Sequence, residues 1–172
     1  MKKIIVFFFI LIFYSLSQSS ERIDKIKITE QLTKEKRKCE IGALAPEFSV
    51  RSVQDPLKRL SLSSLKGKVV LLEFYMEMCG LCRHYLKKTQ KLYDKYKSKG
   101  LAIVCINVYE GNKNSSGYLP SSLFRLLKIN LPNYIAEWDK SHKNFKQVID
   151  YNIRAVPKII IIDRNQKIRY IG

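Results

Sequence analysis

A buried-strand pattern that leads directly into a cysteine pair constrains this chain more than any other feature. Residues 69–75 form an apolar run interrupted by one acid, and a turn-forming Gly67 precedes them. Such a run predicts a central strand that is buried on both faces. Cys79-Gly80-Leu81-Cys82 follows shortly after and opens an amphipathic pattern that predicts a helix over about 80–98, ending at Gly100.

Two cysteines spaced in this way at a strand-to-helix junction have the arrangement that disulfide exchange requires. The unpaired N–H groups and the dipole of the helix N-terminus favour the thiolate of Cys79. Cys82 lies one turn further along, on the apolar face, and is expected to be less exposed. We predict Cys79 as the nucleophile and Cys82 as the resolving sulfur of a redox-active Cys79–Cys82 disulfide. A structural disulfide and a zinc half-site are the alternatives, but His84 alone does not complete a zinc site.

The remaining apolar segments alternate between strand and helix patterns. Strand, helix, strand and helix, followed by a hairpin, indicate an α/β fold with a central sheet. The expected strands are 48–50, 59–62, 101–108, 158–163 and 167–170, the expected helices are 121–129 and 144–151, and a loop is expected at 110–117.

The first 40 residues indicate a targeting segment and a linker. Two lysines precede an apolar run at 4–16, which is shorter than the ~20 residues that span a bilayer, and small residues follow it. We predict a signal peptide over 1–19, with an uncleaved N-terminal anchor as the alternative, a polar linker over 20–40 and one domain over 41–172. Export would place the domain where disulfides persist, in the periplasm or cell envelope if the source is bacterial.

The chain is strongly basic, with a formal net charge of +17. Nucleic-acid binding is not favoured, because the lysines are scattered and no aromatic residues are interleaved to stack on bases. Weak attraction to anionic lipid headgroups or to an acidic partner is the better interpretation. The lysines on which this rests are at positions 87, 88, 91, 95, 97, 99, 140, 143 and 146.

Four segments in order resemble the exported thioredoxin-like proteins of the TlpA/ResA and AhpC/TSA group. They are the opening Gly-Ala-Leu-Ala-Pro-Glu-Phe at 42–48, the strand at 65–74, the cysteine pair, and Ile-Arg-Ala-Val-Pro followed by isoleucines at 153–163. The resemblance covers 41–172 and implies a thioredoxin-like fold with a central mixed sheet flanked by helices. The family usually continues into a final helix, whereas this sequence stops at Gly172, so either that helix is missing or the sequence is a fragment.

The resemblance also implies roles for residues outside the cysteine pair. Glu73 occupies the position of a buried acid that relays a proton to or from the second cysteine, and burial would raise the pKa of its carboxyl. Pro157 would follow a cis peptide bond, face the cysteine pair and expose the backbone of Val156 to a substrate strand. The alternatives are a Glu73 carboxylate that reaches water and an ordinary proline at the start of a strand.

Some positions depart from the family pattern or remain outside it. Met78 stands where the family usually has Trp, and Leu81 stands where many members have Pro, so the direction of electron flow stays open. Cys105 lies within an apolar strand and is interpreted as a packed small hydrophobe. Cys39 is expected to be free or to pair with another chain.

The resemblance implies a thiol–disulfide oxidoreductase that reduces protein disulfides, with an upstream electron donor and no cofactor or metal. A peroxiredoxin-like thiol peroxidase is an alternative, but the residues before Cys79 contain neither the Pro nor the Thr of the P-x-x-x-T-x-x-C pattern. A non-enzymatic metal- or haem-maturation chaperone is the other alternative, since two close cysteines can hold a soft ion such as Cu(I).

Overall fold

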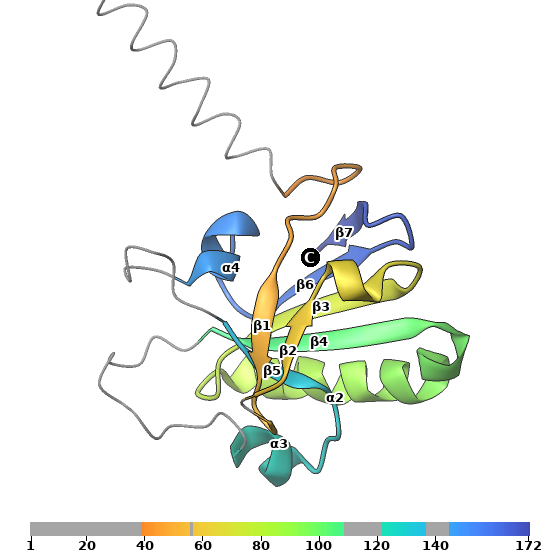
Figure 1. The fold of residues 1–172 in the computed structure, drawn as a ribbon. Coiled ribbons are helices and arrows are strands. Elements are labelled where there is room, and N and C mark those ends of the chain that lie inside the picture. Colours follow the sequence, from red (N-terminus) through yellow and green to blue (C-terminus); the bar gives the residue numbers. More distant parts are fainter. Residues whose placement is uncertain (1–38, 56, 109–121, 137–144) are drawn as a thin grey trace, which may run out of the picture. The chain divides into compact units, whose positions relative to one another are not determined.

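The fold is a mixed β-sheet with helices on both faces, seen in a computed structural model (Figure 1). The structure describes residues 39–55, 57–108, 122–136 and 145–172. The predicted signal peptide, nearly all of the predicted linker and the predicted loop at 110–117 lie outside the described residues. Within the described residues, no helix is both long and apolar enough to cross a membrane.

Seven strands form the sheet in the order β2-β1-β5-β4-β3-β6-β7. The β3 strand pairs in parallel with β4 and antiparallel with β6, so the sheet is mixed. The prediction of the α/β class and of a mixed central sheet is therefore confirmed. The strands are β1 (Ser49–Ser52), β2 (Arg59–Ser61), β3 (Val69–Tyr75), β4 (Leu101–Asn107), β5 (Asn133–Ile135), β6 (Lys158–Ile162) and β7 (Ile168–Ile171).

The central strand β3 is the predicted strand at 69–75, and every residue after Val69 is buried. Its side chains alternate between two buried clusters. Leu71 and Tyr75 belong to one cluster, whereas Leu72 and Phe74 belong to the other. Burial on both faces explains why the strand reads as a continuous apolar run rather than as an alternating pattern.

Helix α2 (Gly80–Tyr96) begins immediately after the loop that follows β3. It buries Cys82, Leu86 and Thr89 against the sheet and continues as a 3₁₀ turn, η2 (Lys97–Lys99). The chain then reverses at Gly100, whose φ of 89° lies in the left-handed region that favours glycine. The helix predicted at about 80–98 with a stop at Gly100 is thus confirmed.

The other helices are short and lie on both sides of the sheet (Figure 1). Helix α3 (Ser122–Leu127) packs with α2 on one face, where Leu123 and Phe124 join the cluster that contains Cys82. Helix α4 (Lys146–Asp150) and the 3₁₀ turn η1 (Ser63–Leu65) lie on the other face. Both α3 and α4 are shorter than the predicted helices at 121–129 and 144–151.

One strand was not predicted from the sequence. Strand β5 pairs in parallel with β4 and antiparallel with β1, and it connects the β1–β2 hairpin to the rest of the sheet. The hairpin joins the predicted strands at 48–50 and 59–62, in the register Val50 opposite Leu60.

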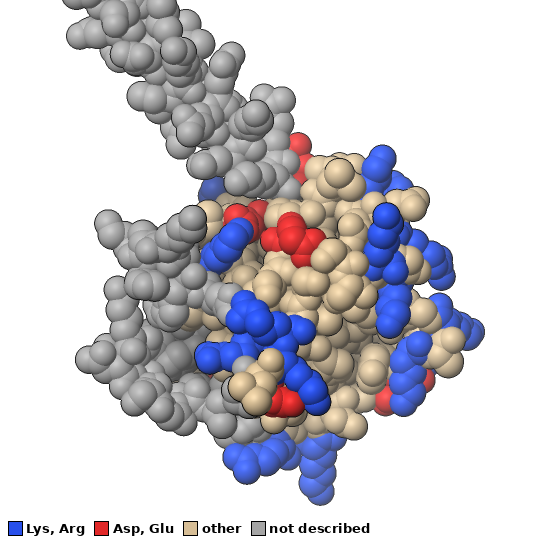
Figure 2. Space-filling model, viewed as in Figure 1, with Lys and Arg blue, Asp and Glu red and all other residues tan. Residues whose placement is uncertain are grey.

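The charged side chains on the visible face of the domain are mostly basic. On the face in Figure 2, Lys and Arg side chains are spread widely and are more numerous than Asp and Glu. The excess of basic residues in the sequence is therefore also visible on this face of the domain.

Candidate active site

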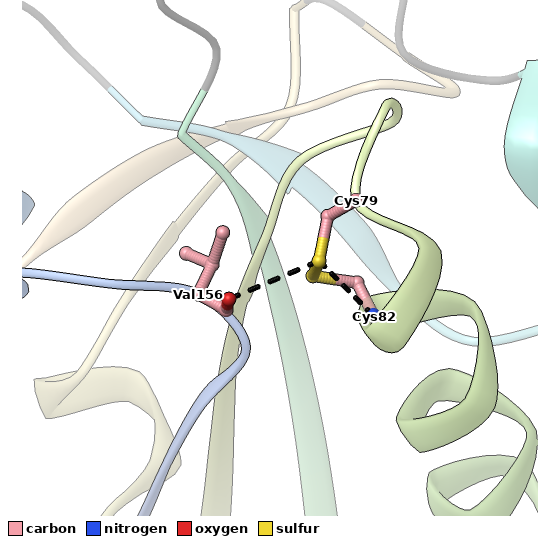
Figure 3. The surroundings of a disulfide bond; sticks show 3 residues. All are labelled: Cys79, Cys82 and Val156. Atoms are coloured by element: carbon pink, nitrogen blue, oxygen red, sulfur yellow. Dashed lines mark hydrogen bonds between the residues drawn. A yellow bond between two sulfur atoms is a disulfide. The ribbon is translucent and has the colours of Figure 1, made fainter.

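Cys79 and Cys82 form a disulfide at the start of α2, with their Cα atoms 5.2 Å apart (Figure 3). Cys79 is the N-cap residue, and its Sγ accepts a hydrogen bond from the backbone N–H of Cys82 at 3.1 Å. Cys79 is half-buried, whereas Cys82 has no exposed surface. A reagent from solution can therefore approach the first sulfur and not the second.

The loop before β6 faces this disulfide. The Val156–Pro157 peptide bond is cis, and the carbonyl oxygen of Val156 lies 3.8 Å from Cys79 Sγ. Figure 3 shows the two segments approaching from different elements, α2 on one side and the loop before β6 on the other. The structure thus brings together residues 79, 82, 156 and 157, which the resemblance grouped.

Glu73 lies in the middle of β3 and has no exposed surface. Glu73 is two residues from both Leu71 and Tyr75, and residues two apart in a strand point to the same face. Its side chain is therefore on the α2 side of the sheet, where Cys82 is also buried. Within the described residues, no donor meets either carboxylate oxygen at the distance and angle of a hydrogen bond, although the Thr89 hydroxyl on α2 is near enough to act on the carboxyl. Burial raises the pKa of this carboxyl to about 7, and the Thr89 hydroxyl on α2 offsets part of the effect. The carboxylate does not reach water, in contrast to one of the two sequence-based interpretations.

A free thiol lies directly across from this acid. Cys105 on β4 is the register partner of Glu73 on β3, and it is also fully buried. Burial raises the pKa of the Cys105 thiol well above its usual range, and the negative charge of Glu73 raises it further. Sequence reasoning treated Cys105 as a packing residue, because its position beside Glu73 depends on the register of two strands rather than on any local pattern.

Glu77 is a further buried acid that sequence reasoning did not single out. It is only 7% exposed, and its Oε1 accepts a hydrogen bond from the backbone N–H of Leu123 at 3.5 Å. This contact connects the segment before Cys79 to the start of α3. No sequence signal pointed to it, since residue 123 is distant in the chain.

Two large apolar side chains next to the disulfide point to solvent. Met78 is 86% exposed and Leu81 is 59% exposed. No group of three or more His, Cys, Asp or Glu that could hold a metal ion occurs in the part of the chain that the structure describes. The site therefore offers one accessible sulfur, one buried sulfur and a buried acid, with apolar side chains around the opening.

A thioredoxin-like fold that carries a Cys-x-x-C disulfide at a helix start is the class that this architecture defines. Residues 41–171 match the model of the AhpC/TSA family, and the chain belongs to that family.

The chain is similar to proteins that are named as thiol-disulfide oxidoreductases or as thioredoxin-like proteins. The chain is 27% identical over 139 residues to the thiol-disulfide oxidoreductase ResA of Bacillus cereus, covering 78% of this chain and 70% of the relative. It is 30% identical over 122 residues to the thioredoxin-like protein YneN of Bacillus subtilis, covering 71% and 65%.

Solved structures support the fold. The thioredoxin domain of a thiol-disulfide oxidoreductase from Bacteroides vulgatus superposes with a TM-score of 0.65 at 22% identity, covering 77% of this chain and 88% of that one. A thiol-disulfide isomerase from Corynebacterium glutamicum superposes with a TM-score of 0.62 at 20% identity, covering 76% and 85%.

Proposed function

We propose that this protein is a thiol–disulfide oxidoreductase that reduces disulfides in protein substrates. The observation that carries the proposal is the asymmetry of the cysteine pair, with Cys79 half-buried at the helix N-cap and Cys82 fully buried behind it. Attack on a substrate needs an accessible sulfur, and release needs a second sulfur within reach. The relatives named thiol-disulfide oxidoreductase support the same reaction class.

The reaction begins with the reduced protein. The Cys79 thiolate attacks one sulfur of the substrate disulfide, so that a mixed disulfide forms and the other substrate sulfur leaves as a thiolate. The Cys82 thiolate then attacks Cys79 Sγ, breaks the mixed disulfide and releases the second substrate thiolate. Both leaving thiolates take up protons. Two electrons pass to the substrate, the Cys79–Cys82 disulfide forms, and an upstream dithiol donor reduces it for the next cycle.

Glu73 accepts the proton of Cys82 before the second attack. Its carboxyl is on the α2 side of the sheet, as Cys82 is, and a pKa of about 7 allows it to gain and lose a proton near neutral pH. Burial of Cys82 gives the thiol no water to which it could lose its proton, so a buried base close to it is needed. The Thr89 hydroxyl on α2 favours the charged form of this base.

Val156 and Pro157 hold the substrate. The Val156 carbonyl is 3.8 Å from Cys79 Sγ, so a peptide bound along this loop has its sulfur next to the nucleophile. An extended substrate segment pairs with the backbone of Val156 in the manner of an added strand. Substrate side chains then contact the exposed Met78 and Leu81.

The protein acts outside the cytoplasm, in the periplasm or cell envelope. Residues 1–19 act as the signal peptide, or as an anchor if they are not cleaved, and 20–40 link them to the domain. Support comes from the basic start and the apolar run that follows it.

Cysteine variants test the proposal. The full chain is reduced and mixed with oxidised insulin, and the loss of substrate disulfides is followed. We expect Cys79→Ser to abolish reduction, and Cys82→Ser to accumulate a mixed disulfide that a non-reducing gel separates. Cys39→Ser serves as the matched control and should retain the activity of the unmodified chain. Full activity of Cys79→Ser would refute the proposal.

A further inference from the structure

A row of exposed cations on α2 begins at the redox cysteine. Four basic residues follow Cys79 at intervals of four, and all of them are exposed. Residues four apart are neighbours on a helix surface, so these residues form one continuous row. The row winds gradually around the helix and extends about 24 Å along its axis from Cys79, at 1.5 Å per residue. We call this the α2 cation row, and it consists of Arg83, Lys87, Lys91 and Lys95.

The α2 cation row has no acidic counterpart in the described part of the chain. Ion pairs there involve Asp55, Asp150 and Asp163, each with a cation outside α2. Asp94, the acid of α2, accepts a hydrogen bond from the Gln90 side chain at 3.0 Å. Like charges four apart disfavour a helix, so the row costs stability that these ion pairs do not restore.

The end of the row at Cys79 is apolar. Met78 and Leu81, on either side of Cys79, are largely exposed, and the Val156 carbonyl closes the other side of the sulfur. A ligand that follows the row towards Cys79 therefore meets cations first and apolar side chains last. This order fits a polypeptide better than a flat membrane surface, because a polypeptide can have an acidic segment and an apolar residue beside its own sulfur.

We propose that the preferred partner is a protein whose reactive cysteine has an apolar neighbour and is joined to an acidic segment, which lies along the α2 cation row. The inference rests on the proposed function and specifies its substrates. The chemistry is the same exchange, in which Cys79 attacks the partner's sulfur and the partner's leaving thiolate takes the proton. Charge complementarity of this kind mainly increases the association rate and weakens with salt.

Two peptides test the partner class. Each contains one cysteine next to a leucine, blocked as a mixed disulfide with thionitrobenzoate, and followed by a run of either glutamates or lysines. The reduced full chain attacks the disulfide, and release of coloured thionitrobenzoate gives the second-order rate constant. We expect the acidic peptide to react at least about tenfold faster at low ionic strength, with the difference shrinking as salt is added.

Two triple variants locate the effect. Arg83→Gln, Lys87→Gln and Lys91→Gln together should remove the preference for the acidic peptide. The control replaces Lys66, Lys68 and Lys167 with Gln, which changes the net charge equally. These exposed lysines lie near the start of β3 and between β6 and β7, at the end of the sheet opposite Cys79. The control should keep the preference.

The outcomes distinguish failure of the acidic-partner proposal from failure of the proposed thiol–disulfide exchange. Equal rates for the two peptides, or equal losses in both triple variants, would overturn the acidic partner while leaving the exchange reaction intact. No reaction with either peptide would instead contradict the proposed function.

A second experiment measures sedimentation of the protein with phosphatidylglycerol vesicles. If the triple variant of the α2 cation row loses vesicle binding but keeps the peptide preference, the row binds a membrane surface and the proposal is wrong. Circular dichroism checks that both variants are folded, and the salt titration of the unmodified chain needs no variant.

Discussion

Glu73 on β3 and Cys105 on β4 are register partners in the centre of the sheet, and neither has any exposed surface. Two ionisable groups in a dry environment cannot both carry a negative charge at moderate cost. The pKa of the Cys105 thiol is raised for this reason: burial raises it most, and the negative charge of Glu73 raises it further. Near neutral pH the acid titrates and the thiol stays neutral.

Replacement of Glu73 by Gln should remove a pH dependence of stability. The folded protein holds the proton up to about pH 7, whereas an ordinary glutamate loses it near 4.5, so the free energy of unfolding falls as pH rises between these values. The unmodified chain should lose about 3 kcal/mol over this window relative to Glu73→Gln. Urea unfolding of the disulfide form at several pH values between 4 and 8 measures the difference.

Glu40→Gln is the matched control for this measurement, because Glu40 is exposed. Its stability profile should parallel that of the unmodified chain. A Glu73→Gln profile that also falls with pH in parallel with the unmodified chain would show that another group titrates.

Replacement of Cys105 by Ser should lower the pKa of Glu73. A hydroxyl is a stronger hydrogen-bond donor than a thiol, and no donor in the described residues meets either carboxylate oxygen at the distance and angle of a hydrogen bond. A hydrogen bond donated to the charged carboxylate stabilises it and therefore lowers the pKa of Glu73. The carbon-13 signal of the labelled Glu73 carboxyl, followed against pH, should show its midpoint below 7 in Cys105→Ser. Cys105→Val, which adds no donor, should not lower it, and a similar drop in both variants would contradict the explanation.

Thiol accessibility should differ between the two cysteines outside the disulfide. Cys105 is fully buried and Cys39 is half-buried, and burial raises the pKa of both thiols. Treatment of the native disulfide form with iodoacetamide should therefore label Cys39 slowly and leave Cys105 unmodified, whereas both react in urea. Peptide mass spectrometry reports the positions, and rapid labelling of residue 105 in the native protein would show that β4 is less protected than its burial indicates.

Tyr151→Phe should destabilise the domain by about 1 kcal/mol. The Tyr151 hydroxyl donates a hydrogen bond to the Pro46 carbonyl at 2.5 Å, and its ring packs against Phe48 and Phe74. Phe keeps these ring contacts and removes only the hydroxyl, so the loss isolates the hydrogen bond. Urea unfolding measures it, and Tyr170→Phe, at an exposed position in β7, is the control that should change little.

Local patterns predicted the elements that are long and strongly apolar. Strand β3 and helix α2 were identified in this way, because burial on two faces and a 3.6-residue period are both visible in the sequence. Strand β5 was missed because three residues carry no period, and only pairing with β4 and β1 makes them a strand. The same reason applies at the site. Glu73 could be recognised from its apolar neighbours and the family resemblance, whereas its pairing with Cys105 and the contact of Glu77 with Leu123 depend on chain segments that meet only in the folded protein.

The cysteine pair and the loop that faces it are synthesised at different times. Val156 follows Cys79 by 77 positions, and the β6 strand beyond it reaches β3 only when nearly the whole described chain exists. A chain synthesised from its N-terminus therefore carries both cysteines long before the loop that faces them. During that interval its thiols lack their folded surroundings. The nascent chain is therefore itself subject to the thiol oxidation and disulfide exchange that act on any unfolded chain with cysteines.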